Sequence, residues 1–321
     1  MVLVCRGTPK IFELVEGRIQ AQDNDLLDSI LKKSVKYETI QRTEGDDDGI
    51  TYGDEVFVFK NDKIIRQIQS DFVKVSYRTE DRSRKIEMFA DVARKWHLAK
   101  QSKEGHVNVV LIGFDSTSSA NFKRKLAESY GYLVKKLQAF VFNGYSIVGD
   151  GTTPALTAML TGKWLKSLKG NFPSLDDWPW IMKDYKSRGY VTLYAEDDPR
   201  IASFNSRLGG FDKQPTDHYI RPFWLAMEQR GLNGRRRNKT DLLYRVCFDS
   251  EPLHNVTLNY VTSFLKAYSD MPKFAFSYFS YLPHGTGEKL NLADKDLLLF
   301  LKNYNEYYHN DTVLIIFGKY W

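Results

Sequence analysis

Hydrophobic and polar positions divide the chain into two regions with different patterns. In residues 1–105, apolar and polar residues alternate in short stretches, at Val56 to Phe59, Ile64 to Ile68 and Phe72 to Tyr77. A period of two residues is typical of strands with one buried face. We therefore expect an N-terminal β-rich region over residues 1–105, with a hairpin turn at Asn61 and Asp62.

From residue 106 onward, apolar runs suited to buried strands alternate with helical patterns. The predicted strands are Val107 to Phe114, Ala139 to Val148, Tyr190 to Ala195, Phe274 to Tyr281 and Thr312 to Phe317. The predicted helices cover Ala120 to Leu137, Pro154 to Leu160, Ile201 to Arg207, Phe223 to Arg230, a segment capped by Asn255, and a segment around Leu297 to Tyr304. Such alternation predicts an α/β domain over residues 106–321 with a mostly parallel, doubly wound sheet.

Composition limits the class of protein. Of the 321 residues, 42% are hydrophobic and 27% charged, which predicts a compact globular chain. We expect no transmembrane segment, because no run of about 18 apolar residues occurs, and the first ten residues do not resemble a signal peptide. The sequence has only two cysteines, Cys5 and Cys247, so a framework of several disulfides is excluded but a single disulfide bond is possible.

Local charge runs add little to the functional picture. The net charge of +6 is compatible with an anionic partner, but basic and acidic residues are mostly mixed. We interpret Arg235, Arg236 and Arg237 as a solvated loop and expect no nucleic-acid contact. The acidic run Asp46 to Asp48 lacks the pattern of a calcium loop, which favours an exposed turn.

Polar residues follow several of the predicted strands. The strand ends deliver Asp115, the segment Gly149 to Thr152, the segment Glu196 to Asp198, and His284. In an open α/β sheet the ligand site lies beyond the carboxyl ends of the strands. Together these residues predict a metal-assisted hydrolytic site, although Asp115 could equally form an Asx turn or a helix cap.

Thr152, Thr153 and Pro154 open a predicted helix. In the simpler interpretation, Thr153 is the N-cap and Pro154 the first helical residue. In the functional interpretation, a threonine hydroxyl at the positive end of the helix attacks a phosphoryl or sulfuryl centre.

Two sequence segments carry a resemblance to a known superfamily. Thr152-Thr153-Pro154 with Leu160-Thr161-Gly162 resembles the nucleophile helix of alkaline phosphatases and sulfatases, and Val109 to Asp115 resembles the strand that precedes it. The resemblance implies an alkaline phosphatase-like fold in which Thr152 is the nucleophile. It also implies a divalent metal (zinc, manganese or calcium) held by Asp115 and Thr152, with His284 or His218 contacting the anionic group.

Three further segments are similar to an animal branch called domain of unknown function 229. They are Tyr194 to Asp197, Pro215 to Tyr219 and Arg221 to Phe223, and the resemblance covers about residues 70 to 317. It implies an extracellular or secretory setting and an anionic small molecule or glycan as substrate.

The sequence departs from this superfamily at two places. Sulfatases place a formylglycine precursor and an arginine where this chain has Thr152 and Leu156, so formylglycine chemistry is not expected. The metal-binding Ser-Asp-His-Gly motif after the last strand is replaced by Gly318-Lys319-Tyr320-Trp321. From these residues we expect a sheet that is incomplete at its C-terminal edge and a site that has lost its metal and its activity.

Three hypotheses follow from the sequence. The first is a metal-dependent phosphate or sulfate ester hydrolase or transferase lineage. The second is a pseudoenzyme or binding module that holds anionic glycans or phosphate without turnover. The third is a non-functional truncated product with exposed hydrophobic surface.

Overall fold

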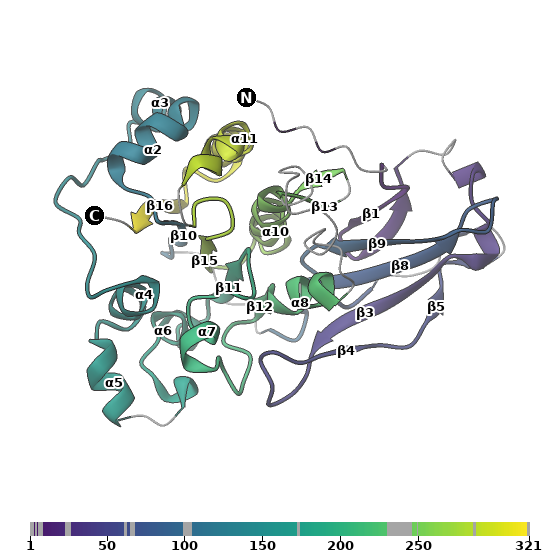
Figure 1. Ribbon diagram of the computed structural model, residues 1–321, viewed down its shortest axis with the longest axis horizontal. Helices are drawn as coiled ribbons and strands as arrows, with labels where there is room; N and C mark the ends of the chain where they lie inside the picture. The colour runs from purple at the N-terminus through teal and green to yellow at the C-terminus, as the bar shows by residue number, and fades with distance from the viewer. Residues whose placement is uncertain are drawn as a thin grey trace.

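A computed structural model describes residues 3, 5, 9–22, 27–60, 63–64, 68–98, 105–171, 174–229, 246–248, 250–284 and 287–319. Within these residues the chain is a mixed α/β protein, in which a parallel sheet lies beside antiparallel sheets (Figure 1). The basic run at Arg235 to Arg237 and the turn expected at Asn61 and Asp62 lie outside the described residues.

The parallel sheet has the strand order β12-β11-β15-β10-β16 in the described part of the chain. Each neighbouring pair is parallel. The strands are β10 (Asn108–Asp115), β11 (Val191–Glu196), β12 (His218–Tyr219), β15 (Lys273–Phe279) and β16 (Thr312–Lys319). The prediction of a parallel sheet is therefore confirmed, and all five carboxyl ends meet at one edge.

Helices pack on both faces of this sheet, because alternate strand residues point to opposite sides. On one face, Val110, Ile112 and Phe114 of β10 join an apolar core with the helices α10 and α11. On the other face, Leu111 joins a second core with α4. The helices are α2 (Ser119–Lys125), α3 (Ala127–Lys135), α4 (Thr152–Thr161), α5 (Leu165–Asn171), α6 (Ile181–Ser187), α7 (Asn205–Leu208), α8 (Arg221–Gln229), α10 (Leu253–Ala267) and α11 (Asp294–Tyr307).

The N-terminal strands form antiparallel sheets around a third apolar core. β8 (Phe72–Arg78) pairs with β3 (Lys36–Arg42) and β9 (Arg84–Ala90), and β3 also pairs with β4 (Ile50–Tyr52) and β5 (Val56–Phe57). The remaining hairpins are β1 (Phe12–Val15) with β2 (Arg18–Ala21), β6 (Phe59–Lys60) with β7 (Lys63–Ile64), and β13 (Cys247–Phe248) with β14 (Glu251–Pro252). Of the strand expected from Ile64 to Ile68, Ile64 lies in β7, Ile68 lies outside any strand, and residues 65–67 are not among the described residues.

The acidic run in the turn between β3 and β4 is only partly exposed. Asp46 and Asp48 are exposed as expected, but Asp47 is only 4% exposed. Its Oδ2 accepts hydrogen bonds from Asn205 Nδ2 at 2.7 Å and from Tyr219 Oη at 3.1 Å, and its Oδ1 accepts from Arg42 Nε at 2.9 Å. The turn therefore joins the antiparallel strands to the parallel sheet, a contact that composition alone could not reveal.

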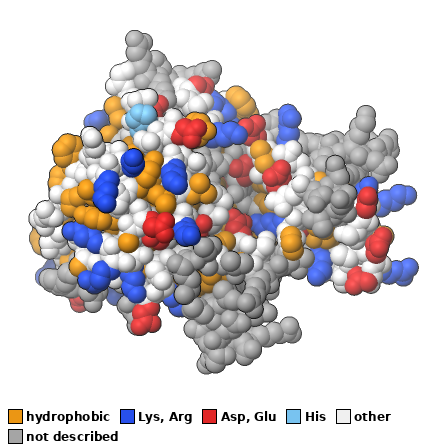
Figure 2. Space-filling view, turned by 90° about the horizontal axis from the view of Figure 1, so that it is seen from above, with side chains coloured by type: hydrophobic (Ala, Val, Ile, Leu, Met, Phe, Trp, Pro, Cys, Tyr) orange, Lys and Arg blue, Asp and Glu red, His pale blue; other side chains and the backbone are white. Residues whose placement is uncertain are grey.

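The apolar segment from Ala139 to Val148 is not a strand. Residues 138–150 contain neither helix nor strand, and the side chains of Phe140 and Phe142 are 90% and 82% exposed. An apolar run forms a strand only where neighbouring strands pair with it, and this run lies on the surface instead. Figure 2 shows one face of the molecule, on which hydrophobic side chains lie exposed among lysines and arginines.

Several helix boundaries also differ from the predictions. The helix expected from Ala120 to Leu137 is two helices that meet at Leu126, and the helix expected at Ile201 to Arg207 is only α7. α4 begins at Thr152 with Gly151 as its N-cap, so Thr153 is not the cap. α10 begins at Leu253 after Pro252, two residues before Asn255.

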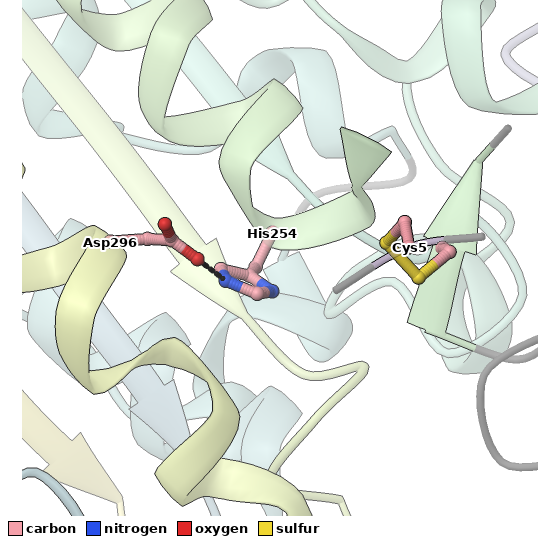
Figure 3. The surroundings of a disulfide bond; sticks show 4 residues. Cys5, His254 and Asp296 are labelled. Carbon is pink, nitrogen blue, oxygen red and sulfur yellow. Dashed lines mark hydrogen bonds and ion pairs between the residues drawn. A yellow bond between two sulfur atoms is a disulfide. The ribbon is translucent and has the colours of Figure 1, made fainter. Parts of the chain in front are cut away.

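A disulfide bond joins Cys5 to Cys247 across 242 residues. It ties the N-terminal segment to β13, close to the first turn of α10 (Figure 3). In that turn His254 is buried, and its Nε2 lies 2.6 Å from Asp296 Oδ2 of α11. These two links fix the start of α10 against its neighbours.

Candidate functional site

Asp115 and Thr152 meet at the carboxyl edge of the parallel sheet. Asp115 is the last residue of β10 and is 2% exposed, and Thr152 is the first residue of α4. Thr152 Oγ1 donates a hydrogen bond to Asp115 Oδ1 at 3.0 Å. The two residues expected to act together are therefore in direct contact, while their roles remain predictions.

Tyr278 completes the environment of the carboxylate. It lies one strand away in β15, and its hydroxyl donates to Asp115 Oδ1 at 3.0 Å. Burial, followed by the nearby charge of Asp115, raises the pKa of Tyr278, so the phenol stays protonated and remains a donor. Gly113 makes room for this arrangement, because a Cβ there would lie 2.5 Å from both the Tyr278 and Phe317 rings.

Lys319 provides a cation that the sequence prediction missed. β16 pairs with β10 in a register that places Lys319 opposite Asp115. Lys319 Nζ donates to Thr152 Oγ1 at 3.2 Å and lies 3.8 Å from Asp115 Oδ1, with the side chain 12% exposed. The sequence analysis treated Lys319 only as a departure from the Ser-Asp-His-Gly motif of the superfamily. The strand register is what shows that its side chain lies beside Asp115.

The backbone around the two partners is unusual. Ser116, directly after Asp115, has φ +49°, and Gly151, directly before Thr152, has φ +96°. Non-glycine residues with positive φ are uncommon and often lie at functional sites. A Cβ at Gly151 would lie 3.1 Å from Arg207 Nη1, so the Arg207 guanidinium packs over the positive N-terminus of α4. This end of the site therefore favours an anion.

The residues present do not fit the divalent metal that the resemblance implies. Asp115 and Thr152 provide two oxygen ligands, whereas zinc takes at least three protein ligands and calcium six or more oxygens. Among the described residues, no group of three His, Cys, Asp or Glu side chains could hold a metal ion. The ammonium of Lys319 lies against both oxygens and would repel a second cation.

Two more carboxyl groups lie where β11 ends. Glu196 accepts from Tyr194 Oη at 2.7 Å and from Ser203 N at 2.9 Å, and burial raises its pKa. Burial also raises the pKa of Asp197 to about 7. Asp197 Oδ1 accepts hydrogen bonds from Ser280 N and Tyr281 N, whereas Oδ2 has no hydrogen-bond partner among the described residues.

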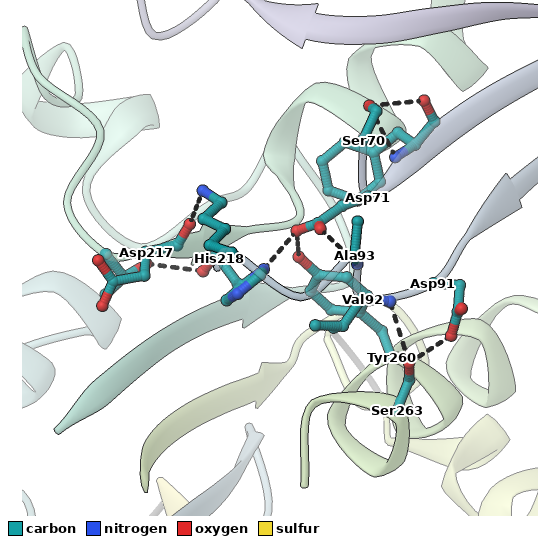
Figure 4. Close-up of polar contacts among 12 residues, drawn as sticks. Ser70, Asp71, Asp91, Val92, Ala93, Asp217, His218, Tyr260 and Ser263 are labelled. Atoms are coloured by element: carbon teal, nitrogen blue, oxygen red, sulfur yellow. Dashed lines mark hydrogen bonds and ion pairs between the residues drawn. The ribbon is translucent and has the colours of Figure 1, made fainter. Parts of the chain in front are cut away.

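His218 lies away from Asp115 and Thr152. It pairs with Leu193 in the middle of β11, and it is fully buried. Its Nδ1 lies 2.6 Å from Asp71 Oδ2, and its Nε2 lies 2.8 Å from the hydroxyl of Tyr268. Tyr268 follows α10 and precedes the amino end of β15 in the chain. Figure 4 shows Asp71 between His218 and Tyr260. The structure thus places His218 in a buried network that joins β8 to α10.

Asp71 at the centre of this network is ionised. Burial alone would raise its pKa, but the charge of His218 and hydrogen bonds from His218 and Tyr260 together lower the pKa below its usual value. Ala93 N also donates to Asp71 Oδ1 at 2.9 Å. The expected role of His218 at an anionic substrate has no support from this position.

His284 is closer to the carboxyl edge. It lies in the loop after β15, whose last residue Phe279 is paired with Phe114 of β10, and its side chain is exposed. The backbone N–H of His284 donates to Ser280 O at 2.9 Å. No contact of its side chain with Asp115 or Thr152 is present in the described residues, so its role as an anion contact remains a prediction.

Fold and site together define a mixed α/β protein with an Asp-Thr-Tyr-Lys cluster at the carboxyl edge of a parallel sheet. The chain belongs to the family described as protein of unknown function (DUF229), whose profile matches residues 22–319. The search of curated proteins finds no match. Among the described residues, no helix is long and apolar enough to cross a membrane.

Proposed function

We propose that the chain is a member of the alkaline phosphatase and sulfatase-like superfamily whose carboxyl-edge site acts on a phosphate or sulfate ester. The observation that carries this proposal is the 3.0 Å hydrogen bond from Thr152 Oγ1 to Asp115 Oδ1 at the first residue of α4. A hydroxyl held at a helix N-terminus is well placed to meet a tetrahedral anion. The parallel sheet with helices on both faces supports the superfamily.

The residues of the site support hydrolysis or group transfer with Thr152 as nucleophile. Its oxygen would form a bond to phosphorus or sulfur while the bond to the ester oxygen breaks, and the threonine proton would pass to Asp115. The leaving alcoholate would take a proton from water and leave hydroxide. The oxygen of a water or alcohol would then form a bond to phosphorus or sulfur while the bond to Thr152 Oγ1 breaks. Thr152 would recover its proton from Asp115, and the proton of the attacking molecule would neutralise the hydroxide. Arg207 and the N-terminus of α4 would hold the anionic oxygens. No step is assigned to a metal ion, because the ligands present do not fit one.

A second function, anion binding without turnover, is favoured by Lys319. Its ammonium donates to the oxygen that would attack and offsets the charge of Asp115. Both effects lower the nucleophilicity of Thr152 while they favour an anionic ligand. A phosphate group or a sulfated or phosphorylated glycan is the class of ligand that suits this site.

The two functions are separated by one set of variants. Turnover of an aryl phosphate and an aryl sulfate ester is measured for the wild type, Thr152→Ala and Thr152→Ser, and binding of inorganic phosphate is measured by calorimetry. Thr161→Ala, at the opposite end of α4, is the matched control. An active site of the proposed kind predicts a loss of at least about 100-fold in Thr152→Ala and substantial activity in Thr152→Ser.

The binding function predicts a different pattern in the same experiment. No variant turns over either ester, Thr152→Ala still binds phosphate, and Lys319→Met binds it at least about tenfold more weakly because the ammonium is lost. Turnover that Thr152→Ala leaves unchanged would contradict the first function. Absence of both turnover and phosphate binding would contradict the assignment of this edge as an anion site.

We also propose a secretory or extracellular setting. The disulfide between Cys5 and Cys247 supports it, because such bonds persist mainly in oxidising compartments. Mapping of free thiols in protein secreted from animal cells tests this proposal, and two reactive thiols in that material would contradict it.

A further inference from the structure

Three Asn-X-Thr triplets occur in the sequence, beginning at Asn238, Asn255 and Asn310. Such a triplet is the acceptor for an N-linked glycan in a chain that enters the secretory pathway. The triplet is short enough to arise by chance, so the sequence does not rank the three. Asn238 lies outside the described residues, and the structure gives the other two different surroundings.

Asn310 lies in an exposed turn. The turn joins the end of α11 at Tyr307 to the start of β16 at Thr312, and the Asn310 side chain is exposed. Its neighbour His309 is also exposed, and Tyr307 is 66% exposed. Within the described part of the chain, the Asn310 amide makes no side-chain hydrogen bond that a glycan would break. A sugar attached here extends into solvent without displacing a buried group.

Thr312, the third residue of the triplet, anchors this turn. It is 4% exposed, and its Oγ1 donates to Asp311 Oδ1 at 2.8 Å and accepts from Asn108 Nδ2 at 3.1 Å. Glycan transfer takes place on the unfolded chain, in which Thr312 is accessible, so its burial after folding is no obstacle. Folding then fixes the turn and leaves the modified asparagine on the outside.

Asn255 has less suitable surroundings. It lies in the first turn of α10 between the buried residues His254 and Val256, and it is itself half-buried. Thr257 of the same triplet is fully buried. A glycan at this position would compete with the packing of α10 against α11 and the parallel sheet.

We propose that Asn310 carries an N-linked glycan. In this step Asn310 Nδ2 forms a bond to the anomeric carbon of N-acetylglucosamine. The bond between that carbon and a lipid-linked diphosphate breaks, the lipid diphosphate leaves with the electron pair, and the amide loses one proton. The Cys5–Cys247 disulfide supports passage through the oxidising compartment where this donor is present.

The glycan lies at the edge of the sheet opposite the candidate site. Asn310 precedes Thr312, which is paired with Asn108 at the amino end of β10, whereas Lys319 is paired with Asp115 at the carboxyl end. The seven residue steps from Thr312 to Lys319 span about 23 Å at ~3.3 Å each. The modification therefore shields the amino edge and leaves the carboxyl edge open to its ligand.

The test uses the full chain behind a cleavable secretion leader in cultured animal cells. A linker with a known acceptor triplet, placed between leader and chain, reports entry into the secretory pathway in the same molecules. Peptides are mapped after enzymatic deglycosylation in heavy-oxygen water, which converts each glycosylated asparagine to a mass-tagged aspartate. Secreted and cell-retained protein are both mapped, because transfer precedes folding.

We expect the mass tag at Asn310 in molecules whose linker is tagged. Asn310→Gln should lose one glycan-sized step in electrophoretic mobility, Thr312→Ser should keep it, and Asn255→Gln should not change it. An untagged Asn310 in molecules with a tagged linker overturns the proposal, whether the protein is secreted or retained. A tag at Asn255 with Asn310 unmodified overturns it as well. This test does not depend on the function proposed for the carboxyl edge.

Discussion

The free energy of unfolding of the wild type should fall as the pH rises because Asp197 ionises, and Asp197→Asn should abolish this part of the pH dependence. Asp197 follows β11 and is 3% exposed. Its Oδ1 accepts from Ser280 N at 2.8 Å and from Tyr281 N at 3.0 Å, whereas Oδ2 has no partner among the described residues. Burial outweighs these two hydrogen bonds and raises the pKa of Asp197 from 3.8 to about 7.

The sign of the effect follows from proton binding. The folded protein holds the proton of Asp197 more tightly than the unfolded chain does. The contribution of this group to stability is therefore fully present below pH 3.8, falls as the pH rises, and is lost above pH 7. At about 1.4 kcal/mol per pKa unit, the loss between pH 5 and pH 8 is roughly 2–3 kcal/mol. Asparagine keeps the oxygen that accepts the two N–H groups and does not ionise.

Urea unfolding followed by tryptophan fluorescence at pH 5, 6, 7 and 8 measures this difference. Between pH 5 and pH 8, the free energy of unfolding of the wild type should fall roughly 2–3 kcal/mol further than that of Asp197→Asn. Asp184→Asn, an exposed position on α6, is the matched control and should follow the wild type. Parallel curves for the wild type and Asp197→Asn would refute the argument that burial raises this pKa.

Three further predictions concern the framework around the site. Cys5→Ser with Cys247→Ser should lower the free energy of unfolding by about 2–5 kcal/mol, and adding reductant to the wild type should remove the difference. Gly113→Ala should cost about 1–3 kcal/mol in thermal unfolding, because its methyl group would overlap two aromatic rings, and an unchanged melting temperature would contradict that packing. Asp71→Asn should cost about 3–5 kcal/mol at pH 7, because it leaves His218 without its buried partner. Since the pKa of Asp71 is lowered in the fold, this deficit should shrink as the pH falls below about 4, which denaturation at pH 3 and pH 7 would show.

The sequence predicts four of the five strands in the described parallel sheet, because each of the four is a mostly apolar run. β10, β11 and β15 are buried on both faces, where such runs have few alternatives. β16 is an edge strand that leaves Val313 and Ile315 exposed, and the two-residue strand β12 was not predicted. The same rule failed at Ala139 to Val148, where the apolar residues pair with no strand in the described structure. Whether an apolar run becomes a strand depends on hydrogen-bonding partners that lie far away in the chain.

The contact between Asp115 and Thr152 was expected from the superfamily resemblance and does not follow from chain direction alone. Asp115 ends a strand at the carboxyl edge, but α2, α3 and a segment without strand separate β10 from α4. Lys319 and Tyr278 were not predictable, because their approach depends on which strands flank β10 and in what register. Strand order is decided by tertiary packing, and no local pattern records it.

Buried charged groups also could not be predicted from the sequence, whereas the types of secondary structure could. Composition and periodicity alone determine that this chain has a β-rich start, an α/β remainder and a polar strand end at Asp115. Only the tertiary structure decides that Asp47 is buried, that His218 contacts Asp71, and that an ammonium group lies beside Thr152. The physical reason is that burial and charge pairing depend on distances between residues far apart in sequence, whereas strand and helix patterns depend on neighbours within a few positions.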